Sequence, residues 1–205
     1  MGKIRETTLI LGEGPTEFYY FKSLCDVCRG VTFSPDYPKH TCIKELKAEI
    51  EKGIASGFNH IYCVIDMDNK DNGPELIQYN QLKAKYSKPI VKPRKGINCD
   101  VVFFETQRCT ELFFLYYYRY TSREYNTQDA LIKDLNKSVK YQKSLDFFMK
   151  CKGLHNYFEK NGGSLDNAVK NSVQSMEEMK QSGRTFTYSG IGHLINILKG
   201  NQENP

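Results

Sequence analysis

Two short hydrophobic runs, each followed closely by a pair of carboxylates, constrain this chain more than any other feature. The runs are residues 9–11 and 61–65, and both are apolar and contain β-branched side chains. Such runs are typical of strands buried on both faces of a parallel sheet. The carboxylates that follow them are Glu13, Glu17, Asp66 and Asp68. Ligands of open α/β sheets bind beyond the carboxyl ends of the strands, which is where both pairs fall.

The spacing within each pair lets its two carboxylates converge. Glu13 and Glu17 are four residues apart, so they share a helical face if the helix has begun at Glu13. Asp66 and Asp68 are two residues apart, so they point to the same side of an extended segment. Carboxylates that meet repel one another unless protons or hard cations compensate them, so we expect a Mg²⁺ or Mn²⁺ site. Taken alone, a charge at a helix start and a polar turn are simpler explanations of the two pairs.

The composition is that of a globular protein. The chain has 205 residues, of which 26% are charged and 13% aromatic, enough for one substantial domain with a small helical appendage. The net charge of +5 is modest and does not by itself indicate a nucleic-acid partner. The charge becomes a stronger indication of such a partner because the acidic site concentrates negative charge, so the basic residues must lie elsewhere on the surface.

The sequence also bears on the compartment. Residues 1–5 are polar and run directly into the first predicted strand, so we expect no signal peptide. No apolar run approaches the roughly 20 residues that span a bilayer, so we expect no membrane association. Seven cysteines without a disulfide-like spacing are typical of reduced thiols, which predicts a cytoplasmic protein.

Predicted strands alternate with predicted helices through the first 120 residues. We expect strands at 7–11, 60–65, 88–92 and 101–104, with a weak extended segment at 31–33 before a proline-containing loop at 34–39. We expect helices at 15–28, 42–56, 74–86 and 111–120. This alternation with short loops indicates βαβ units, and so an α/β fold with a mostly parallel sheet flanked by helices.

Beyond residue 121 the strand patterns stop. The remaining predicted elements are helices, at about 129–135, 145–158, 165–180 and 190–199. We therefore divide the chain into an α/β catalytic core, residues 1–120, and a helical C-terminal extension, residues 121–205, packed on the core.

Four motifs in a fixed order carry a family resemblance. A strand ending in Glu-Gly and a later strand ending in Asp-x-Asp, here Glu13-Gly14 and Asp66-Met67-Asp68, resemble the Toprim domain of topoisomerases, bacterial primases and OLD-type nucleases. The stretch 13–21, Glu-Gly-Pro-Thr-Glu-Phe-Tyr-Tyr-Phe, resembles the opening of RloB-like proteins more specifically. Residues 109–117, Cys-Thr-Glu-Leu-Phe-Phe-Leu-Tyr-Tyr, and 189–195, Ser-Gly-Ile-Gly-His-Leu-Ile, are similar to two helices of that family.

The resemblance implies a Toprim-like fold and a metal-dependent nuclease of bacterial restriction and phage defence. The implied partners are DNA or RNA and an ATPase from the same defence locus. Three positions depart from the family pattern. Thr110 replaces an aromatic residue, Tyr117 stands where the family helix tends to have His, and Arg108 stands where Pro is common. The role of a family His at the position of Tyr117 is therefore open in this chain.

The resemblance also assigns roles at the site. Asp66 and Asp68 are expected to be metal ligands, and Glu13 a metal ligand or the general base for the attacking water. Glu17 would complete the first metal's shell, and Glu111 is the candidate for a fifth carboxylate near a second metal. Glu111 could equally be a buried acid satisfied by a basic partner.

Basic and aromatic residues offer candidate contacts to nucleic acid. A basic cluster around a predicted strand end, expected on the same edge as the carboxylates, could seat phosphates or be a solvated loop. It comprises Lys88, Lys92, Arg94 and Lys95. Lys170, in the helical region, is a weaker candidate for stabilising transition-state charge. The tyrosines at 116–118 and 120 could stack on bases, but their helical spacing favours core and rim positions.

Cysteines invite a second metal hypothesis. Cys25 and Cys28, with His40 and Cys42 nearby, have a zinc-like spacing, but Cys25 fits the apolar stripe of a predicted helix. We consider zinc binding there the weaker interpretation.

Two classes of function remain. The first is a metal-dependent phosphodiesterase that cleaves DNA or RNA in host defence. The second is a non-catalytic Toprim module that binds nucleic acid or a partner ATPase as a sensor or effector scaffold. Primase or topoisomerase activity ranks third, because neither a primase zinc module nor a catalytic tyrosine domain is evident.

Overall fold

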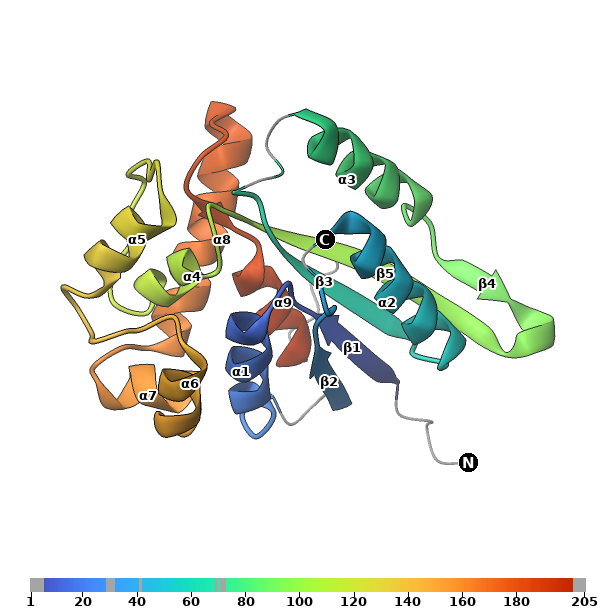
Figure 1. Cartoon of the computed structure of the whole chain (residues 1–205), viewed down its shortest axis with the longest axis horizontal. Coiled ribbons are helices and arrows are strands. Elements are labelled where there is room, and N and C mark those ends of the chain that lie inside the picture. Colours follow the sequence, from blue (N-terminus) through green and yellow to red (C-terminus); the bar gives the residue numbers. More distant parts are fainter. Residues whose placement is uncertain (1–5, 29–31, 41, 69, 71–72, 201–205) are drawn as a thin grey trace.

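A computed structural model describes residues 6–28, 32–40, 42–68, 70 and 73–200 of the chain. Within these residues a six-stranded sheet has the order β2-β1-β3-β5-β4, with β6 paired to β5 as well (Figure 1). Its parallel strands are β1 (Thr7–Leu11), β2 (Thr32–Asp36), β3 (His60–Asp66) and β5 (Ile97–Gln107). The short strands β4 (Ile90–Lys92) and β6 (Tyr188–Ser189) are antiparallel to β5. The predicted α/β fold with a mostly parallel sheet and a C-terminal helical region is confirmed.

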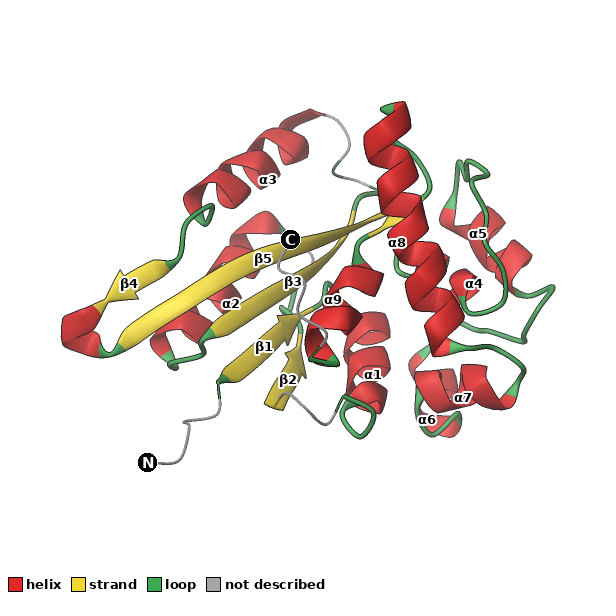
Figure 2. Cartoon of the chain, turned by 180° about the vertical axis from the view of Figure 1, so that it is seen from behind, coloured by secondary structure: helices red, strands yellow, loops and turns green. Residues whose placement is uncertain are grey.

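Helices flank the sheet and continue beyond it. Those of the first half are α1 (Pro15–Leu24), α2 (Ile43–Ala55), α3 (Gly73–Lys85) and α4 (Glu111–Tyr116), with a 3₁₀ turn at Pro93–Lys95. Those of the second half are α5 (Gln128–Leu135), α6 (Leu145–Lys150), α7 (Leu154–Lys160), α8 (Leu165–Ser182) and α9 (Ile191–Leu198). Figure 2 shows the second group gathered at one end of the sheet, beside α1 and α4.

Alternate side chains of each strand enter two separate cores, which explains the continuous apolar runs. Leu9 and Leu11 of β1 pack with α2 and α3, whereas Ile10 between them packs with α1 and α9. Strand β3 repeats this pattern, with Cys63 in the first core and Val64 in the second. A strand that is buried on both faces needs apolar residues at consecutive positions.

The aromatic helix α4 lies inside the larger core. All six of its residues are buried, as is Tyr117 directly after it, while Tyr118 and Tyr120 are half-buried. The Tyr117 hydroxyl pairs with Tyr20 at 2.8 Å and with Nδ1 of His155 at 3.0 Å. The expected core and rim positions are confirmed, and Tyr117 lies in a buried network rather than at an open site.

Several predicted boundaries were wrong for local reasons. Strand β6 lies beyond residue 121, where we expected no strand; its two residues are too few to form a recognisable pattern. Strand β2 runs through the predicted proline loop, because Pro35 lies in an edge strand that tolerates a missing N–H donor. The helix expected at 145–158 is two helices, α6 and α7, since Gly153 between them has a φ of 104°.

The proposed boundary at residue 120 stays a prediction. The larger core nevertheless contains side chains from both sides of it, including Phe114 of α4 and Phe158 of α7, whose rings lie 4.9 Å apart. Among the described helices, none has the length and apolar character needed to cross a membrane.

Candidate functional site

The turn between β1 and α1 holds Glu13 and Glu17 at the carboxyl end of β1. Gly12 is required there, because a Cβ on it would lie 2.2 Å from the Cβ of Glu17. Pro15 is the first residue of α1, a position where its missing N–H costs nothing. Glu17 folds back over the helix start, and its Oε2 accepts a hydrogen bond from the Gly14 N–H at 2.9 Å. The Glu17 side chain is thereby buried beneath the turn.

Asp66, the last residue of β3, joins three segments of the chain. Its Oδ1 accepts hydrogen bonds from the main-chain N–H of Thr110 at 2.8 Å and from the Thr110 hydroxyl at 3.0 Å. Its own N–H donates to Oε1 of Glu13 at 3.2 Å. The expectation that both acidic strand ends open on one edge of the sheet is confirmed, because β1 and β3 are parallel neighbours.

A lysine that we did not predict lies between these two strand ends. The Lys70 ammonium is 2.8 and 2.9 Å from the two carboxylate oxygens of Glu13 and 3.0 Å from the main-chain oxygen of Asp66. Its side chain is buried, with 5% exposed. Asp68, half-buried in the same turn, acts on Glu13 as a repelling charge.

Glu111 forms the other side of the site. It is fully buried at the start of α4, and its Oε1 accepts a hydrogen bond from the Tyr141 hydroxyl at 2.8 Å. Its Oε2 accepts one from the Gln128 amide at 3.2 Å. The Lys143 ammonium pairs with it at 3.2 Å. The alternative of a buried acid with a basic partner therefore describes its present contacts, and a role in metal binding stays a prediction.

Burial and repulsion between carboxylates raise the pKa of three acids of the site. Burial raises the pKa of Asp66 well above its usual value, and the charges of Glu17, Glu13 and Glu111 raise it further. Burial raises the pKa of Glu17, followed by repulsion from Glu111. Burial also raises the pKa of Glu13 to about 7, although Lys70 opposes the shift. Four carboxylates, from the turn after β1 and from α1, β3 and α4, thus lie within electrostatic reach of one another.

One oxygen of this group lacks a hydrogen-bond partner. Oε1 of Glu17 is buried and accepts no hydrogen bond within the described part of the chain. The Thr110 hydroxyl also faces Glu17, but its single proton is donated to Asp66. A buried unsatisfied carboxylate oxygen is costly, and a hard cation is the group that would satisfy it. The donor chemistry therefore fits Mg²⁺ or Mn²⁺.

The carboxylates do not form a complete coordination cage as they stand. Among the residues that the structure describes, no three acidic, histidine or cysteine side chains are arranged to hold a metal ion. Lys70 and Lys143 supply the positive charge instead. The metal-ligand roles of Glu13, Glu17, Asp66, Asp68 and Glu111 remain predictions.

Three of the four residues of the basic cluster, Lys92, Arg94 and Lys95, lie at the opposite end of the sheet, so the expected position of the cluster was wrong. The 3₁₀ turn at Pro93–Lys95 and the left-handed Gly96 reverse the chain, which makes β4 antiparallel and pairs Lys92 with Ile97 at the start of β5. The carboxylates lie at the other end of this 11-residue strand, about 33 Å away along it. A role in nucleic-acid binding stays a prediction for the four residues of this cluster, Lys88, Lys92, Arg94 and Lys95.

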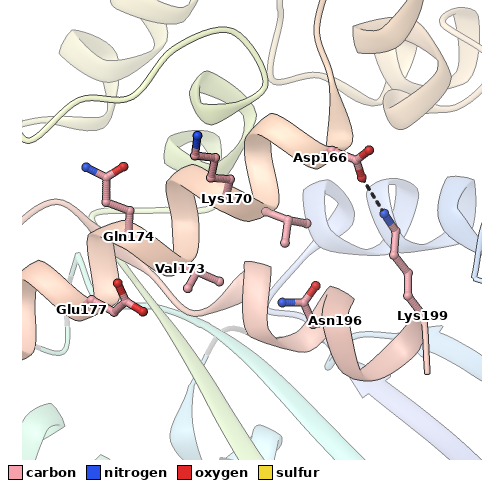
Figure 3. A pocket seen from close by; sticks show the side chains of 8 residues that line it. Asp166, Lys170, Val173, Gln174, Glu177, Asn196 and Lys199 are labelled. Atoms are coloured by element: carbon pink, nitrogen blue, oxygen red, sulfur yellow. Dashed lines mark hydrogen bonds and ion pairs between the residues drawn. The ribbon is translucent and has the colours of Figure 1, made fainter. Parts of the chain in front are cut away.

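Lys170 lies on the exposed surface of α8. Its ammonium points away from Asn196 of α9, whereas Asp166 and Lys199 form an ion pair at 3.0 Å (Figure 3). The cations that act on the buried carboxylates are Lys70 and Lys143. A role for Lys170 in stabilising charge stays a prediction, without a contact to support it among the described residues.

The cysteine hypothesis gains no support. Cys25 and Cys42 are exposed, Cys28 is buried, and no cysteine in the described ranges takes part in a disulfide or a metal-holding group. Burial raises the pKa of Cys28 to about 11, which disfavours the thiolate that zinc requires.

Sequence reasoning missed the polar partners of the carboxylates. Lys70 follows Asp68 by two residues, so its nearness was a usable signal. Thr110 was noticed only as a departure from a family pattern. Gln128, Tyr141 and Lys143 come from loops and helix ends that carry no motif, and only the folded chain brings them to Glu111.

Comparison with known proteins places the chain in a family. No curated protein and no solved structure is detectably similar to it. A family model described as RloB-like protein matches residues 8–198, which spans nearly all the elements described above and all five carboxylates of the site. The chain belongs to the RloB-like protein family.

Proposed function

We propose that this protein is a divalent-metal-dependent nuclease that hydrolyses phosphodiester bonds of DNA or RNA in bacterial restriction or phage defence. The observation that carries the proposal is that four carboxylates lie within electrostatic reach of one another at the carboxyl edge of the sheet, and that Oε1 of Glu17 is buried without a hydrogen-bond partner in the described part of the chain. Membership of the RloB-like family and the Toprim-like order of the motifs support it.

The residues divide into those that would hold the cation and those that position them. Glu13, Asp66 and Asp68 would hold it, with Glu17 contributing its unpaired oxygen. A bound Mg²⁺ or Mn²⁺ would supply charge stabilisation at a phosphoryl oxygen and a more acidic water. Thr110 fixes the carboxylate of Asp66 through two hydrogen bonds. Tyr141 and Gln128 fix that of Glu111.

Glu13 is the candidate for the general base if it does not itself hold the cation. Its side chain keeps 16% of its surface exposed, whereas those of Glu17 and Glu111 are enclosed. Water can therefore reach Glu13 at the edge of the sheet. A general base must lie within hydrogen-bond reach of the water that it deprotonates.

The test uses the full chain with a matched pair of variants. Wild-type protein is titrated with Mn²⁺ in a calorimeter and incubated with single- and double-stranded DNA, RNA and tRNA in Mg²⁺ or Mn²⁺. We expect metal binding and cleavage in the wild type and the loss of both in Asp66→Asn. Asp166→Asn, which changes an acid that is 90% exposed, should behave as wild type. Wild-type protein that binds neither metal and cleaves no substrate contradicts the proposal.

A second candidate is favoured by one specific observation. Lys70 and Lys143 already neutralise Glu13 and Glu111 inside the protein, as they would in a module that needs no metal. Such a module would bind nucleic acid or a partner ATPase of the same defence locus. It would keep its cellular protection against phage in Asp66→Ala, provided that the variant folds, whereas a nuclease would lose it.

A further inference from the structure

We infer that Lys70 is a built-in cation that neutralises Glu13 in the metal-free protein and that a divalent cation must displace it in order to bind. Lys70 would therefore set the metal affinity of the site. This inference rests on the proposed metal site, and it adds a residue that competes with the metal instead of binding it.

The first step is that each N–H donor of the Lys70 ammonium has an acceptor oxygen within the protein. An ammonium has three N–H donors. Three acceptor oxygens surround that of Lys70: both carboxylate oxygens of Glu13, at 2.8 and 2.9 Å, and the main-chain oxygen of Asp66 at 3.0 Å. The side chain is 5% exposed, so water contributes little to its solvation. Lys70 therefore has the contacts of a bound cation, not those of a surface lysine.

The second step is the identity of the oxygens that Lys70 occupies. Glu13 is the acid that we expect to bind the metal or the attacking water, and Lys70 engages both of its oxygens. A divalent ion at these oxygens would lie within a few ångströms of the ammonium. Two positive charges at that separation repel strongly in a buried site. The two cations are therefore alternatives at Glu13.

The third step is the short tether that holds Lys70 there. The Lys70 N–H donates to the main-chain oxygen of Met67 at 3.2 Å, which closes a turn directly after β3. This turn contains Asp68 and begins beside Asp66. The competing cation and two expected metal ligands thus belong to one short segment, so metal binding and release of Lys70 are coupled locally.

Lys143 differs from Lys70 in this respect. It shares Glu111 with the Tyr141 hydroxyl and the Gln128 amide, and its side chain is 36% exposed. Its ammonium lies 3.2 and 3.4 Å from the two Glu111 oxygens, farther than Lys70 lies from Glu13. We therefore assign the competition to Lys70 alone.

The test compares Lys70→Met with Lys180→Met, which removes the same charge from the exposed surface of α8. Mn²⁺ affinity is measured by calorimetry, and melting temperature is measured in EDTA and in Mn²⁺. We expect Lys70→Met to bind Mn²⁺ about tenfold more tightly, a typical coupling between two sites. It should also melt at a lower temperature in EDTA and gain more from Mn²⁺ than wild type. Lys180→Met should match wild type in all three measurements.

A second measurement needs no variant and so survives a folding failure of Lys70→Met. Wild-type protein is acylated with a lysine reagent, and the modification of Lys70 is followed by mass spectrometry against Lys83, whose side chain is 42% exposed. We expect slow acylation of Lys70 in EDTA and faster acylation in saturating Mn²⁺. Unchanged or slower acylation in Mn²⁺ overturns the inference.

The outcomes separate this inference from the proposed function. If wild type binds Mn²⁺ and Lys70→Met binds it equally or more weakly, the inference is wrong and the proposed metal site stands. If neither protein binds Mn²⁺, the proposed metal site fails and the inference fails with it.

Discussion

Thr110 holds Asp66 through two hydrogen bonds to the same oxygen, from its main-chain N–H at 2.8 Å and from its hydroxyl at 3.0 Å. The Asp66 carboxylate ends β3, whereas Thr110 precedes α4, which begins with Glu111. This contact therefore ties the two sides of the acidic site together. It also gives a physical role to a position that departs from the family pattern.

The hydroxyl bond can be removed without a change of shape. We expect Thr110→Val to lower the free energy of unfolding by about 1–2 kcal/mol, because Asp66 is buried and loses one of its two donors from Thr110. Mn²⁺ affinity should fall severalfold, since the carboxylate is less well oriented. Urea unfolding and calorimetry measure the two effects. Thr185→Val, on an exposed loop, is the control. Equal results for both variants would show that the hydroxyl hydrogen bond contributes neither to stability nor to metal affinity.

Glu17 offers a test in which stability and metal affinity move in opposite directions. We expect Glu17→Gln to raise the melting temperature in EDTA, because it removes a buried charge that repels Glu111 and Asp66. The same change should weaken Mn²⁺ binding by about tenfold or more through loss of a charged ligand. Glu51→Gln changes an acid of which the side chain is 52% exposed, and it should do neither. A Glu17→Gln variant that loses stability in EDTA would mean that the carboxylate's contact with the Gly14 N–H stabilises the fold more than its repulsion of Glu111 and Asp66 destabilises it.

Sequence patterns correctly predicted the strands that are buried on both faces of the sheet. β1 and β3 are enclosed on both faces, so their runs are continuously apolar and their parallel pairing was expected. The same patterns failed for β4. A strand next to a four-residue turn reads like any other short strand, and only the reversal at Gly96 makes it antiparallel. The error moved the basic cluster to the wrong edge.

The acids of the site were predictable and their partners were not. Glu13, Asp66 and Asp68 follow strands of recognisable pattern, so their common edge follows from the topology. Lys143 and Tyr141 reach Glu111 from 32 and 30 residues away. Their placement depends on how the C-terminal helices pack against α4, which no local pattern encodes.

The close approach of Gly12 to Glu17 predicts how substitutions in the turn before α1 change the stability of the protein. We expect Gly12→Ala to lower the free energy of unfolding by about 3 kcal/mol, because the new Cβ would lie 2.2 Å from the Glu17 Cβ and force the buried turn to shift. Gly14→Ala is the matched control. Its Cβ would meet nothing closer than 3.9 Å, and its φ of −169° is ordinary extended backbone.

Chemical denaturation of the two alanine variants measures this difference. We expect the Gly14→Ala cost to stay below about 1 kcal/mol, the usual cost of alanine at a helix start. A larger loss for Gly14→Ala than for Gly12→Ala would contradict the close packing of Glu17 against Gly12. Mn²⁺ affinity should also fall in Gly12→Ala alone, since the shift moves Glu13 and Glu17.

The position of the basic cluster predicts that its effect on nucleic-acid binding depends on substrate length. Lys92, Arg94 and Lys95 lie at the end of β5 far from the acidic site, about 33 Å away along the strand, and Lys88 precedes β4. We expect replacement of Lys88, Lys92, Arg94 and Lys95 by Ala to weaken binding of nucleic acids longer than about 10 base pairs, and to lessen the salt dependence of that binding. Cleavage of shorter oligonucleotides should be unchanged. Equal losses for short and long substrates would place the cluster's effect at the cleavage site instead.

His60 gives the protein a pH-dependent stability that is independent of the acidic site. A hydrogen bond to Asp100 at 2.5 Å, with a weaker contribution from Glu6, raises the pKa of His60 from 6.5 to about 9. Because the folded state holds this proton more tightly than the unfolded state, the stabilisation is fully present below pH 6.5 and is lost as the pH rises through 9. The ring is 27% exposed and Glu6 is 69% exposed, so we expect a stabilisation of about 1–2 kcal/mol after solvent screening.

Urea unfolding in EDTA at pH 6 and pH 9.5 measures this stabilisation as the difference in unfolding free energy between wild type and His60→Gln. That difference should be large at pH 6 and small at pH 9.5. His193→Gln should show no such decrease with rising pH, because burial lowers the pKa of His193. An equal difference for His60→Gln at both pH values would mean that the ion pair with Asp100 does not form.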